Sequence, residues 1–400
     1  MDYILKNGRI ASLDEIKDIY IKGGKIERIG ENIKANGLDV EIIDLENRLV
    51  LDGFVDAHMH LDKALINERI ANRSGTLDEA IRIMGEYKPK MSMEDIKDRA
   101  NRVLEKAYGN GTRYIRTHVD VDHIIKLNSL QALMEIREEW KDKVEMQIVA
   151  FPQEGVVDKE EAFHYLREAV EMGADIVGGI PAREENPVEH ISMIFDLALK
   201  HDLDIDMHID ETDDPKSLTL RDLANMAVKN GYIGRVSAGH CCSLAANEKE
   251  DILPILELVK EASLNIISLP STNLYLQGRG DTRNIRRGIT PIKYMIEQDV
   301  DVFIASDNVR DAFNPFGNAN LLEIALITAH GAHMGGEENL KNLFDMVSHL
   351  PMEAFGFNKN LKVGNRANFI MLDAVSKPGA IISQSGLYGY FEDGKLRRKE

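Results

Sequence analysis

Short apolar segments alternate with longer amphipathic segments over most of the chain. Eight short segments lie between residues 53 and 308: GFVDAHMH, TRYIRTHVDV, VEMQIVAFPQEG, ADIVGGIPA, LDIDMHIDE, RVSAGHCCSL, LNIISLPSTN and VDVFIASDN. Near-continuous apolar runs of this length are typical of strands that are buried on both faces of a parallel sheet. Between them, helical periodicity predicts helices over residues 78–108, 158–173, 187–201, 216–230 and 249–262.

This order of elements predicts an α/β fold built as a (β/α)₈ TIM barrel. An open doubly wound sheet would need a glycine-rich nucleotide turn after its first strand, and the sequence has none there. The first fifty residues are predicted to form short strands, with a hairpin turn at Gly23–Gly24. Near the C-terminus, NFIMLD and GYFEDGKLRR also have the pattern of strands. We therefore predict a small β domain over residues 1–53 and 361–400, and the barrel over residues 54–360.

Composition and charge exclude several classes of partner. The 400 residues include 49 Lys and Arg and 67 Asp and Glu. The resulting net charge of −18 disfavours binding to nucleic acid or to anionic membranes. Cys241 and Cys242 are adjacent and cannot form a disulfide framework or a CxxC metal site. The first residues lack the features of a signal peptide, and no stretch approaches 18 apolar residues. We expect a cytoplasmic enzyme that acts on a small molecule.

Histidines gather at the carboxyl ends of the predicted strands, where barrel enzymes carry their active sites. Five of the twelve histidines lie there: His58, His60, His118, His208 and His240. His58 and His60 are two residues apart and therefore face the same side of a strand. Asp307 ends the eighth strand, and Glu211 follows His208 by three residues. Three imidazoles and a carboxylate suit Zn²⁺ or Fe²⁺ with an open position for water.

Some residues near these ends keep two interpretations. His118 either lines the pocket or supports Asp120 and the metal ligands, and Lys63 either belongs to the pocket or is a solvated partner of Asp62. Four arginines between residues 279 and 287 either face an anionic substrate or, as the acidic chain favours, form ion pairs or a subunit contact. In the acidic stretch HIDETDD, Asp213 or Asp214 is expected to cap the following helix.

Long motifs along the chain resemble the amidohydrolase superfamily, in its cytosine deaminase branch. They include GFVDAHMHLDKA, THVDVD, FPQEG, HIDE, GHCCSL, LQGRGDTRNIRRGIT and SDNVRDAFNPFGNANLLE. The resemblance implies a distorted TIM barrel of the metal-dependent hydrolase type, with a β-sandwich built from both chain ends, and commonly a homo-oligomer. It implies one divalent ion, Fe²⁺ or Zn²⁺, held by His58, His60, His208 and Asp307.

The same resemblance assigns roles to the remaining site residues. Glu211 maps to the general acid/base, His240 to the group that orients the hydrolytic water, Gln153 to the side chain that binds the ring carbonyl, and Phe313 to an aromatic wall. Asp307 and His240 would accept the proton of the attacking water, which adds to the ring carbon that bears the amino group. The resemblance thus predicts a hydrolase of carbon–nitrogen bonds in cyclic amidines, with cytosine or a related pyrimidine as substrate.

Two positions depart from the cytosine deaminase pattern and keep other substrates open. Asn308 stands where those enzymes carry an acid near the substrate, and Lys63 replaces a small polar residue. An N-substituted triazine of the N-isopropylammelide kind, creatinine or isocytosine is therefore an alternative substrate. A barrel that has lost catalysis and persists as a binding or assembly protein is disfavoured, because such decay would remove at least one metal or catalytic residue and all of them are present.

Overall fold

The computed structural model describes residues 1–35 and 39–398, and its centre is a barrel of parallel strands. The barrel strands follow one another in chain order: β6 (Phe54–Met59), β7 (Thr112–Asp120), β8 (Glu145–Phe151), β9 (Ile176–Gly179), β10 (Asp204–Ile209), β11 (Val236–His240), β12 (Asn265–Ser268) and β13 (Val302–Ile304). Every neighbouring pair is parallel. All eight predicted strands are present, and the predicted TIM barrel is confirmed.

The barrel closes between its first and last strands at the residues of chemical interest. Met59 and Asp307 form a parallel bridge. The backbone N–H of Asp307 donates to the carbonyl of His58 at 2.8 Å, and the N–H of His60 donates to the carbonyl of Asp307 at 3.3 Å. These hydrogen bonds hold the HxH segment and Asp307 against each other.

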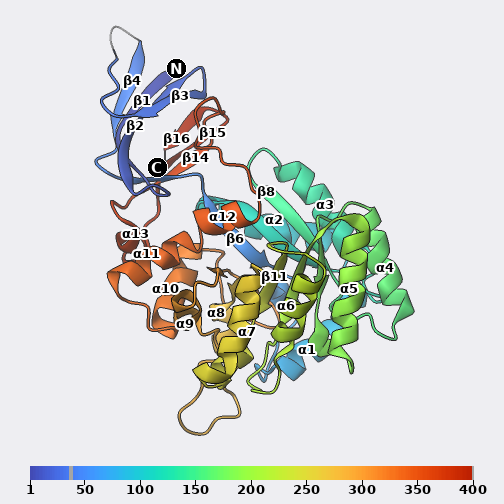
Figure 1. Ribbon diagram of the computed structural model, residues 1–400. Helices are drawn as coiled ribbons and strands as arrows, with labels where there is room; N and C mark the ends of the chain where they lie inside the picture. The colour runs from blue at the N-terminus through green and yellow to red at the C-terminus, as the bar shows by residue number, and fades with distance from the viewer. Residues whose placement is uncertain (36–38, 399–400) are drawn as a thin grey trace.

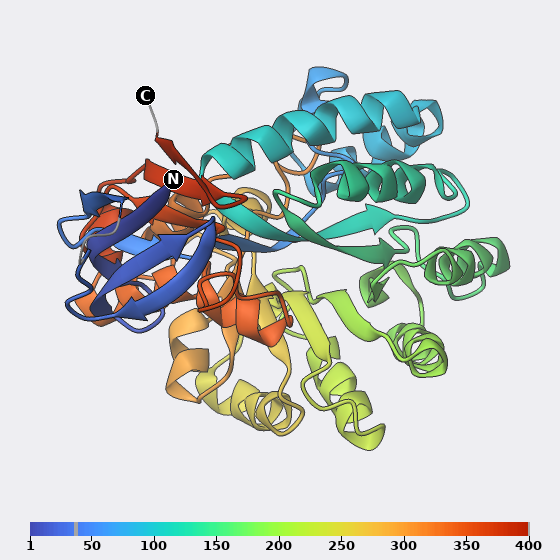
Figure 2. The ribbon, with the colours of Figure 1, turned by 90° about the horizontal axis from the view of Figure 1, so that it is seen from above.

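Helices surround the barrel strands (Figure 2). In the described part of the chain they are α1 (Leu77–Tyr87), α2 (Met93–Gly109), α3 (Asn128–Trp140), α4 (Glu160–Glu171), α5 (Pro187–His201), α6 (Thr219–Lys229), α7 (Lys249–Glu261), α8 (Pro270–Leu276), α9 (Ile292–Glu297), α10 (Leu321–Gly331), α11 (Glu337–Asp345), α12 (His349–Ala354) and α13 (Lys377–Ile382). In the same ranges, no helix has both the length and the apolar character that a membrane crossing requires.

Two helix predictions were wrong in detail. The helix expected over 78–108 is divided into α1, a 3₁₀ turn at Lys88–Lys90 and α2. Pro89 has no N–H for an intrahelical bond, and Ser92 starts the second helix by accepting a hydrogen bond from the N–H of Asp95.

The helix expected from residue 216 begins three residues later, at Thr219. The N–H groups of Thr219 and Leu220 donate to the carboxylate of Asp210, at 3.0 Å each. Asp213 instead accepts a hydrogen bond from the N–H of Gly278, so the expected cap at Asp213 or Asp214 is replaced by Asp210.

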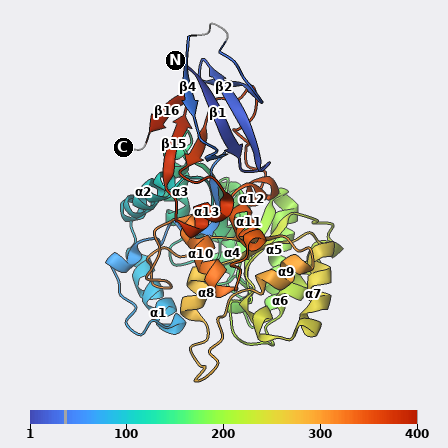
Figure 3. The same cartoon turned by 90° about the vertical axis from the view of Figure 1, so that its left-hand side faces the viewer.

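Both ends of the chain contribute to a second sheet, which projects from one side of the barrel (Figures 1 and 3). Its strands are β1 (Asp2–Ile10), β2 (Glu15–Lys22), β3 (Lys25–Gly30), β4 (Val40–Asp44), β5 (Leu49–Leu51), β14 (Phe369–Leu372), β15 (Leu387–Glu392) and β16 (Lys395–Arg398). The first and last parts of the chain join where β5 pairs with β14.

The terminal sheet encloses a hydrophobic core of its own. Leu5, Ile19 and Val50 from the first part of the chain pack with Phe369 and Phe391 from the last part. Lys25 also bridges Arg366, which brings the edge at β3 back toward the segment before β14. The predicted Gly23–Gly24 turn joins β2 and β3 with φ angles of 57° and 79°, a backbone conformation that glycine adopts without strain.

Candidate active site

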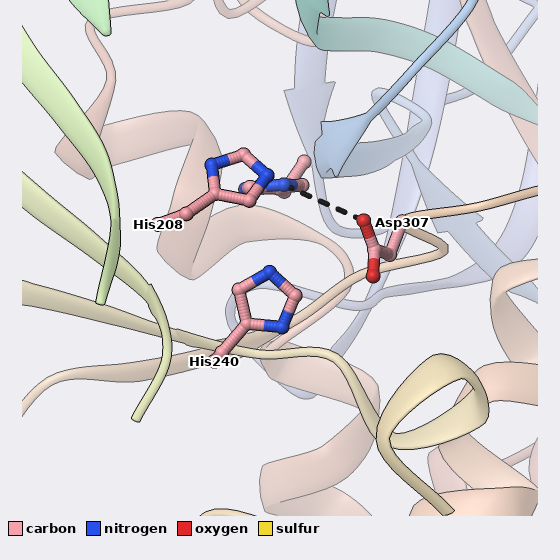
Figure 4. A group of neighbouring side chains, drawn as sticks. His208, His240 and Asp307 are labelled. Carbon is pink, nitrogen blue, oxygen red and sulfur yellow. Dashed lines mark ion pairs between the residues drawn. The ribbon is translucent and has the colours of Figure 1, made fainter. Parts of the chain in front are cut away.

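Five ionisable side chains converge at the carboxyl ends of four barrel strands. His58 lies in β6 and His60 directly after it, His208 lies in β10, His240 ends β11, and Asp307 follows β13. All five are buried. Figure 4 shows His208, His240 and Asp307 pointing toward one another. The period of two along β6 and the common strand direction place these groups together, as the sequence predicted.

The donor atoms of this group lie close enough to share one ion. Nε2 of His60 lies 3.1 Å from Nε2 of His208 and 3.4 Å from Oδ1 of Asp307. Nε2 of His58 lies 3.6 Å from the same oxygen. Ligand atoms of His58, His208, His240 and Asp307 all lie within 4.8 Å of one another. Geometry therefore places both His60 and His240 next to the three other candidate ligands.

The polar atoms of this group fit a bound divalent cation. Nε2 of His58, Nε2 of His240 and both carboxylate oxygens of Asp307 are buried and have no hydrogen-bond partner among the described residues. Burial lowers the pKa of His58, His60 and His208 well below the ordinary value, which keeps these imidazoles neutral. Neutral imidazoles and a carboxylate are the ligands that Zn²⁺ and Fe²⁺ accept, and leaving such groups unpaired in an interior is costly.

His118 lies beside the candidate metal site and against one of its candidate ligands. Its ring stacks on that of His58 with centroids 3.9 Å apart, and its Nε2 lies 3.4 Å from Oδ1 of Asp206. Asp206 in turn accepts a hydrogen bond from Arg116 at 3.0 Å. Of the two interpretations of His118, these contacts favour support of the candidate ligand His58.

Glu211 and His240 form a pair beside the candidate metal ligands. Oε1 of Glu211 lies 3.6 Å from Nδ1 of His240. Burial, and secondarily the charge of Asp307, raises the pKa of Glu211 to about 8, while burial lowers the pKa of His240 to about 4. A neutral carboxyl next to a neutral imidazole provides a proton donor and a proton acceptor at neutral pH.

His240 is held by residues that the sequence analysis did not single out. The amide nitrogen of Asn273 lies 3.0 Å from Nδ1 of His240, and Thr290 donates to the His240 carbonyl at 2.6 Å. His240 also has a φ of 70°, and a non-glycine residue in this region costs free energy that the surrounding contacts must offset. Asn273 belongs to the polar run PSTN after the seventh strand, and that placement was the available signal.

Lys63 is buried and not solvated, which removes one of its two interpretations. Its ammonium donates to Oδ1 of Asp120 at 2.7 Å and to Oε1 of Gln153 at 3.1 Å. It lies 5.7 Å from the ring centre of Phe151 and 5.8 Å from that of Phe313. The structure thus brings Lys63, Gln153 and Phe313 to one small cavity.

Asn308 is hydrogen-bonded within the protein. Its amide nitrogen donates to Oδ2 of Asp311 at 2.6 Å, and its amide oxygen lies 3.5 Å from the hydroxyl of Thr272. Burial raises the pKa of Asp311 to about 7. Asn308 therefore connects the buried carboxyl of Asp311 to the chain next to the candidate ligand Asp307.

We expect Asn308→Asp to destabilise the protein increasingly as the pH rises. The new carboxyl would face Asp311 at hydrogen-bond distance, and like charges raise the pKa of such a pair in the folded state. A folded-state pKa above the unfolded value of about 4 gives stability that is present at low pH and lost as the pH rises through the folded-state pKa. Thermal melts of wild type and variant at about pH 5 and pH 8 measure this, and an equal melting difference at both pH values would contradict it.

The arginine group lies apart from the candidate site. Arg286 pairs with Asp281 at 2.9 Å, and Arg287 donates to the carbonyls of His330 and Gly331. Both line a separate pocket of about 500 Å³ that contains none of the predicted metal, catalytic or substrate-binding residues. Ion pairing and carbonyl contacts thus account for these two arginines.

Comparisons with known proteins agree with this geometry. The family model described as "Amidohydrolase family" matches residues 41–383. The chain belongs to the amidohydrolase family. At 32% identity, this amidohydrolase matches N-isopropylammelide isopropyl amidohydrolase of Pseudomonas sp. (strain ADP) over 100% of its own length and 98% of the relative's. Pterin deaminase of Rhizobium rhizogenes is 35% identical, over 77% of this chain and 70% of the relative.

Solved structures of similar proteins cover the whole amidohydrolase chain. The structure of 5-methylcytosine deaminase from Klebsiella pneumoniae, liganded with 5-fluorocytosine, matches with a TM-score of 0.93 and 33% identity, over 100% of this chain and 98% of that one. N-isopropylammelide isopropylaminohydrolase from Burkholderia multivorans matches with a TM-score of 0.83 and 25% identity, over 99% and 98%. The expected enzyme class, a hydrolase of carbon–nitrogen bonds in cyclic amidines, is confirmed at that level.

Proposed function

We propose that this amidohydrolase is a metal-dependent hydrolytic deaminase of an oxo-substituted nitrogen heterocycle, with cytosine and its 5-methyl derivative as the first substrates to test. The observation that carries the proposal is the Glu211–His240 pair, 3.6 Å apart, beside the buried and unpartnered atoms of His58, His240 and Asp307. A proton donor and a proton acceptor next to a cation site are what hydrolysis of an amino-substituted ring requires.

We propose His58, His60, His208 and Asp307 as the ligands of one Zn²⁺ or Fe²⁺. The bound ion would supply Lewis acidity and lower the pKa of water toward about 7. Asp307 and His240 accept the proton of the attacking water, because burial disfavours the charge of Asp307 and His240 is neutral. Glu211 is protonated at pH 7 and donates to the ring nitrogen next to the attacked carbon. The deprotonated Glu211 carboxylate then takes the second proton of the water, which is released as the tetrahedral centre collapses to the carbonyl, and passes it to the departing amine. The proton held by Asp307 and His240 restores the Glu211 carboxyl.

Substrate orientation falls to Gln153, Lys63 and Phe313 in this proposal. The ammonium of Lys63 occupies the amide oxygen of Gln153, so the amide nitrogen of Gln153 remains as a donor to a ring carbonyl. Phe313 offers an apolar face against the plane of the ring. Such positioning brings the amino-bearing carbon to the catalytic groups and contributes through orientation.

An N-alkylamino triazine is the second candidate substrate. Two observations favour it: the relative that acts on N-isopropylammelide is matched over the full chain, and Lys63 stands directly behind the HxH segment. The chemistry is the same, with an alkylamine as the leaving group in place of ammonia. The same catalytic residues would serve both substrates. The two candidates are therefore distinguished by measuring which ring the enzyme hydrolyses.

We expect purified, metal-loaded enzyme to release ammonia from cytosine or 5-methylcytosine faster than from pterin or creatinine. The measurement follows ammonia and alkylamine release from these rings and from N-isopropylammelide under identical conditions. Release of isopropylamine from N-isopropylammelide, without ammonia release from the other rings, would show that the substrate is an N-alkylamino triazine. Absence of turnover on every ring, with the metal bound, would refute the deaminase proposal.

A further inference from the structure

A buried cluster of alternating charges lies directly behind Lys63 and Gln153. It consists of Lys63, Lys88, Asp120, Asp122 and Glu154, and Arg183 joins it from the half-exposed side at 3.2 Å from Glu154. Lys88 and Asp122 are at most 2% exposed in their side chains. The catalytic steps proposed above do not use Lys88, so its burial among three carboxylates calls for a physical reason.

Lys88 has no N–H left for a ligand. Its ammonium lies 2.7 Å from Oδ2 of Asp122, 2.9 Å from Oδ2 of Asp120 and 3.1 Å from Oε1 of Glu154. An ammonium group has three N–H donors, and three acceptors surround this one. Burial disfavours its charge, but the carboxylates, Asp120 first, raise the pKa of Lys88 above the ordinary value. Lys88 is therefore a charged and fully paired group.

Within residues 1–35 and 39–398, Lys63 has two hydrogen-bond partners, which leaves it one N–H. The partners are Oδ1 of Asp120 at 2.7 Å and the amide oxygen of Gln153 at 3.1 Å. Because lysine only donates, Gln153 must turn its oxygen toward Lys63 and its NH₂ group away from it. The corner formed by Lys63, Gln153 and Phe313 thus offers hydrogen-bond donors from both polar side chains.

Lys88 controls both donors through the carboxylates that it binds. Asp120 bridges the two lysines, since Oδ1 binds Lys63 and Oδ2 binds Lys88. Glu154 is the chain neighbour of Gln153, so the Lys88–Glu154 contact anchors the loop that carries Gln153. The break between α1 and α2 at Pro89 brings Lys88 to this position. One buried ammonium therefore fixes the position of Lys63 and the orientation of Gln153.

We infer that Lys88 is a positioning residue for substrate selection: it holds Lys63 and Gln153 as paired donors, and the site consequently selects rings that present an oxygen acceptor at this corner. This inference rests on the proposed function only in placing the ring at the corner. A ring without that oxygen leaves two buried donors unpaired, and such a mismatch discriminates strongly between ligands. The selected class is nitrogen heterocycles that carry a ring oxo group.

The test compares the binding of two rings that differ by one oxygen. Titration calorimetry with metal-loaded enzyme measures the Kd of pyrimidin-2-one, which carries the acceptor, and of pyrimidine, which lacks it. In wild type we expect the oxo ring to bind more tightly. In Lys88→Met we expect the Kd of pyrimidin-2-one to rise about 100-fold, the loss expected when the donors are misplaced by about 1 Å. The Kd of pyrimidine should stay within about twofold of the wild-type value. This readout needs no turnover, so it remains decisive if the deaminase proposal fails.

Lys97→Met is the matched control, because Lys97 also contacts two carboxylates, Glu135 and Glu139, but on the helix surface. We expect it to leave both dissociation constants unchanged. Equal losses for both rings in Lys88→Met, or an unchanged preference for the oxo ring, would overturn the inference.

If Lys88→Met does not fold, Glu154→Ala removes one contact of Lys88 at a side chain that is 18% exposed. The same selective loss of oxo-ring binding, of smaller size, is then expected. Retention of the wild-type preference in this folded variant would overturn the inference.

Discussion

Replacing Glu211 by Gln is expected to lower kcat by about 10²–10⁴-fold, the usual contribution of a general acid. The amide keeps the shape of the side chain but cannot pass a proton between the ring nitrogen and the departing amine. Burial raises the pKa of Glu211 to about 8, which keeps the wild-type carboxyl protonated at neutral pH. Steady-state kinetics on the best substrate of the panel, together with metal content, measures the effect.

A suitable control for this variant is Glu105→Gln, which makes the same change at an exposed position of α2. We expect it to retain wild-type kcat. The metal content of Glu211→Gln should equal that of wild type, because Glu211 is outside the proposed ligand set. A variant that retains metal and also retains kcat within about threefold would exclude Glu211 as the general acid.

His60→Ala and His240→Ala are expected to separate metal binding from catalysis. The proposed ligand set contains His60, whereas the four side chains whose ligand atoms all lie within 4.8 Å of one another include His240 instead. His240 also lies next to Glu211, which places it in the proposed proton-transfer pair. We expect His60→Ala to weaken metal binding by more than about 100-fold, beyond the loss typical of an outer-shell residue. We expect His240→Ala to keep the metal and lose kcat by about 10²–10⁴-fold.

Metal content after dialysis and a zinc titration of each apoprotein distinguish these outcomes. His164→Ala serves as a control, because the side chain of His164 is 60% exposed on α4 and we expect no effect. If His240→Ala loses the metal and His60→Ala retains it, the two roles are reversed. His240 would then be a metal ligand and His60 would belong to the proton-transfer pair.

The predicted barrel and candidate metal site follow from rules that act locally along the chain. Eight apolar runs separated by amphipathic segments leave few folds other than a barrel, and the ends of parallel strands in a barrel meet at one rim. The two-residue spacing of His58 and His60 places them on one side of β6 whatever the rest of the chain does. These features were accessible because period and strand direction alone determine them.

Other features depended on contacts between segments that are far apart in the sequence. The position of Lys63 is an example, because a lysine after a strand is solvated in most proteins and is buried here by Asp120 and Gln153, 57 and 90 residues away. Asn273 beside His240, 33 residues away, was missed for the same reason. The helix break at Pro89 was locally encoded, but its role in burying Lys88 was not.

The sequence by itself determined the barrel, the terminal β domain, the family resemblance and the side chains that could hold a metal ion. Only the tertiary structure decided which polar groups are desolvated and how they are paired. Burial raises the pKa of Glu211 and lowers the pKa of His240, and ion pairs and hydrogen bonds join Lys63, Lys88 and Gln153 in one buried network. The physical reason is that periodicity is a property of neighbouring residues, whereas the free energy of a buried charge depends on every segment packed around it.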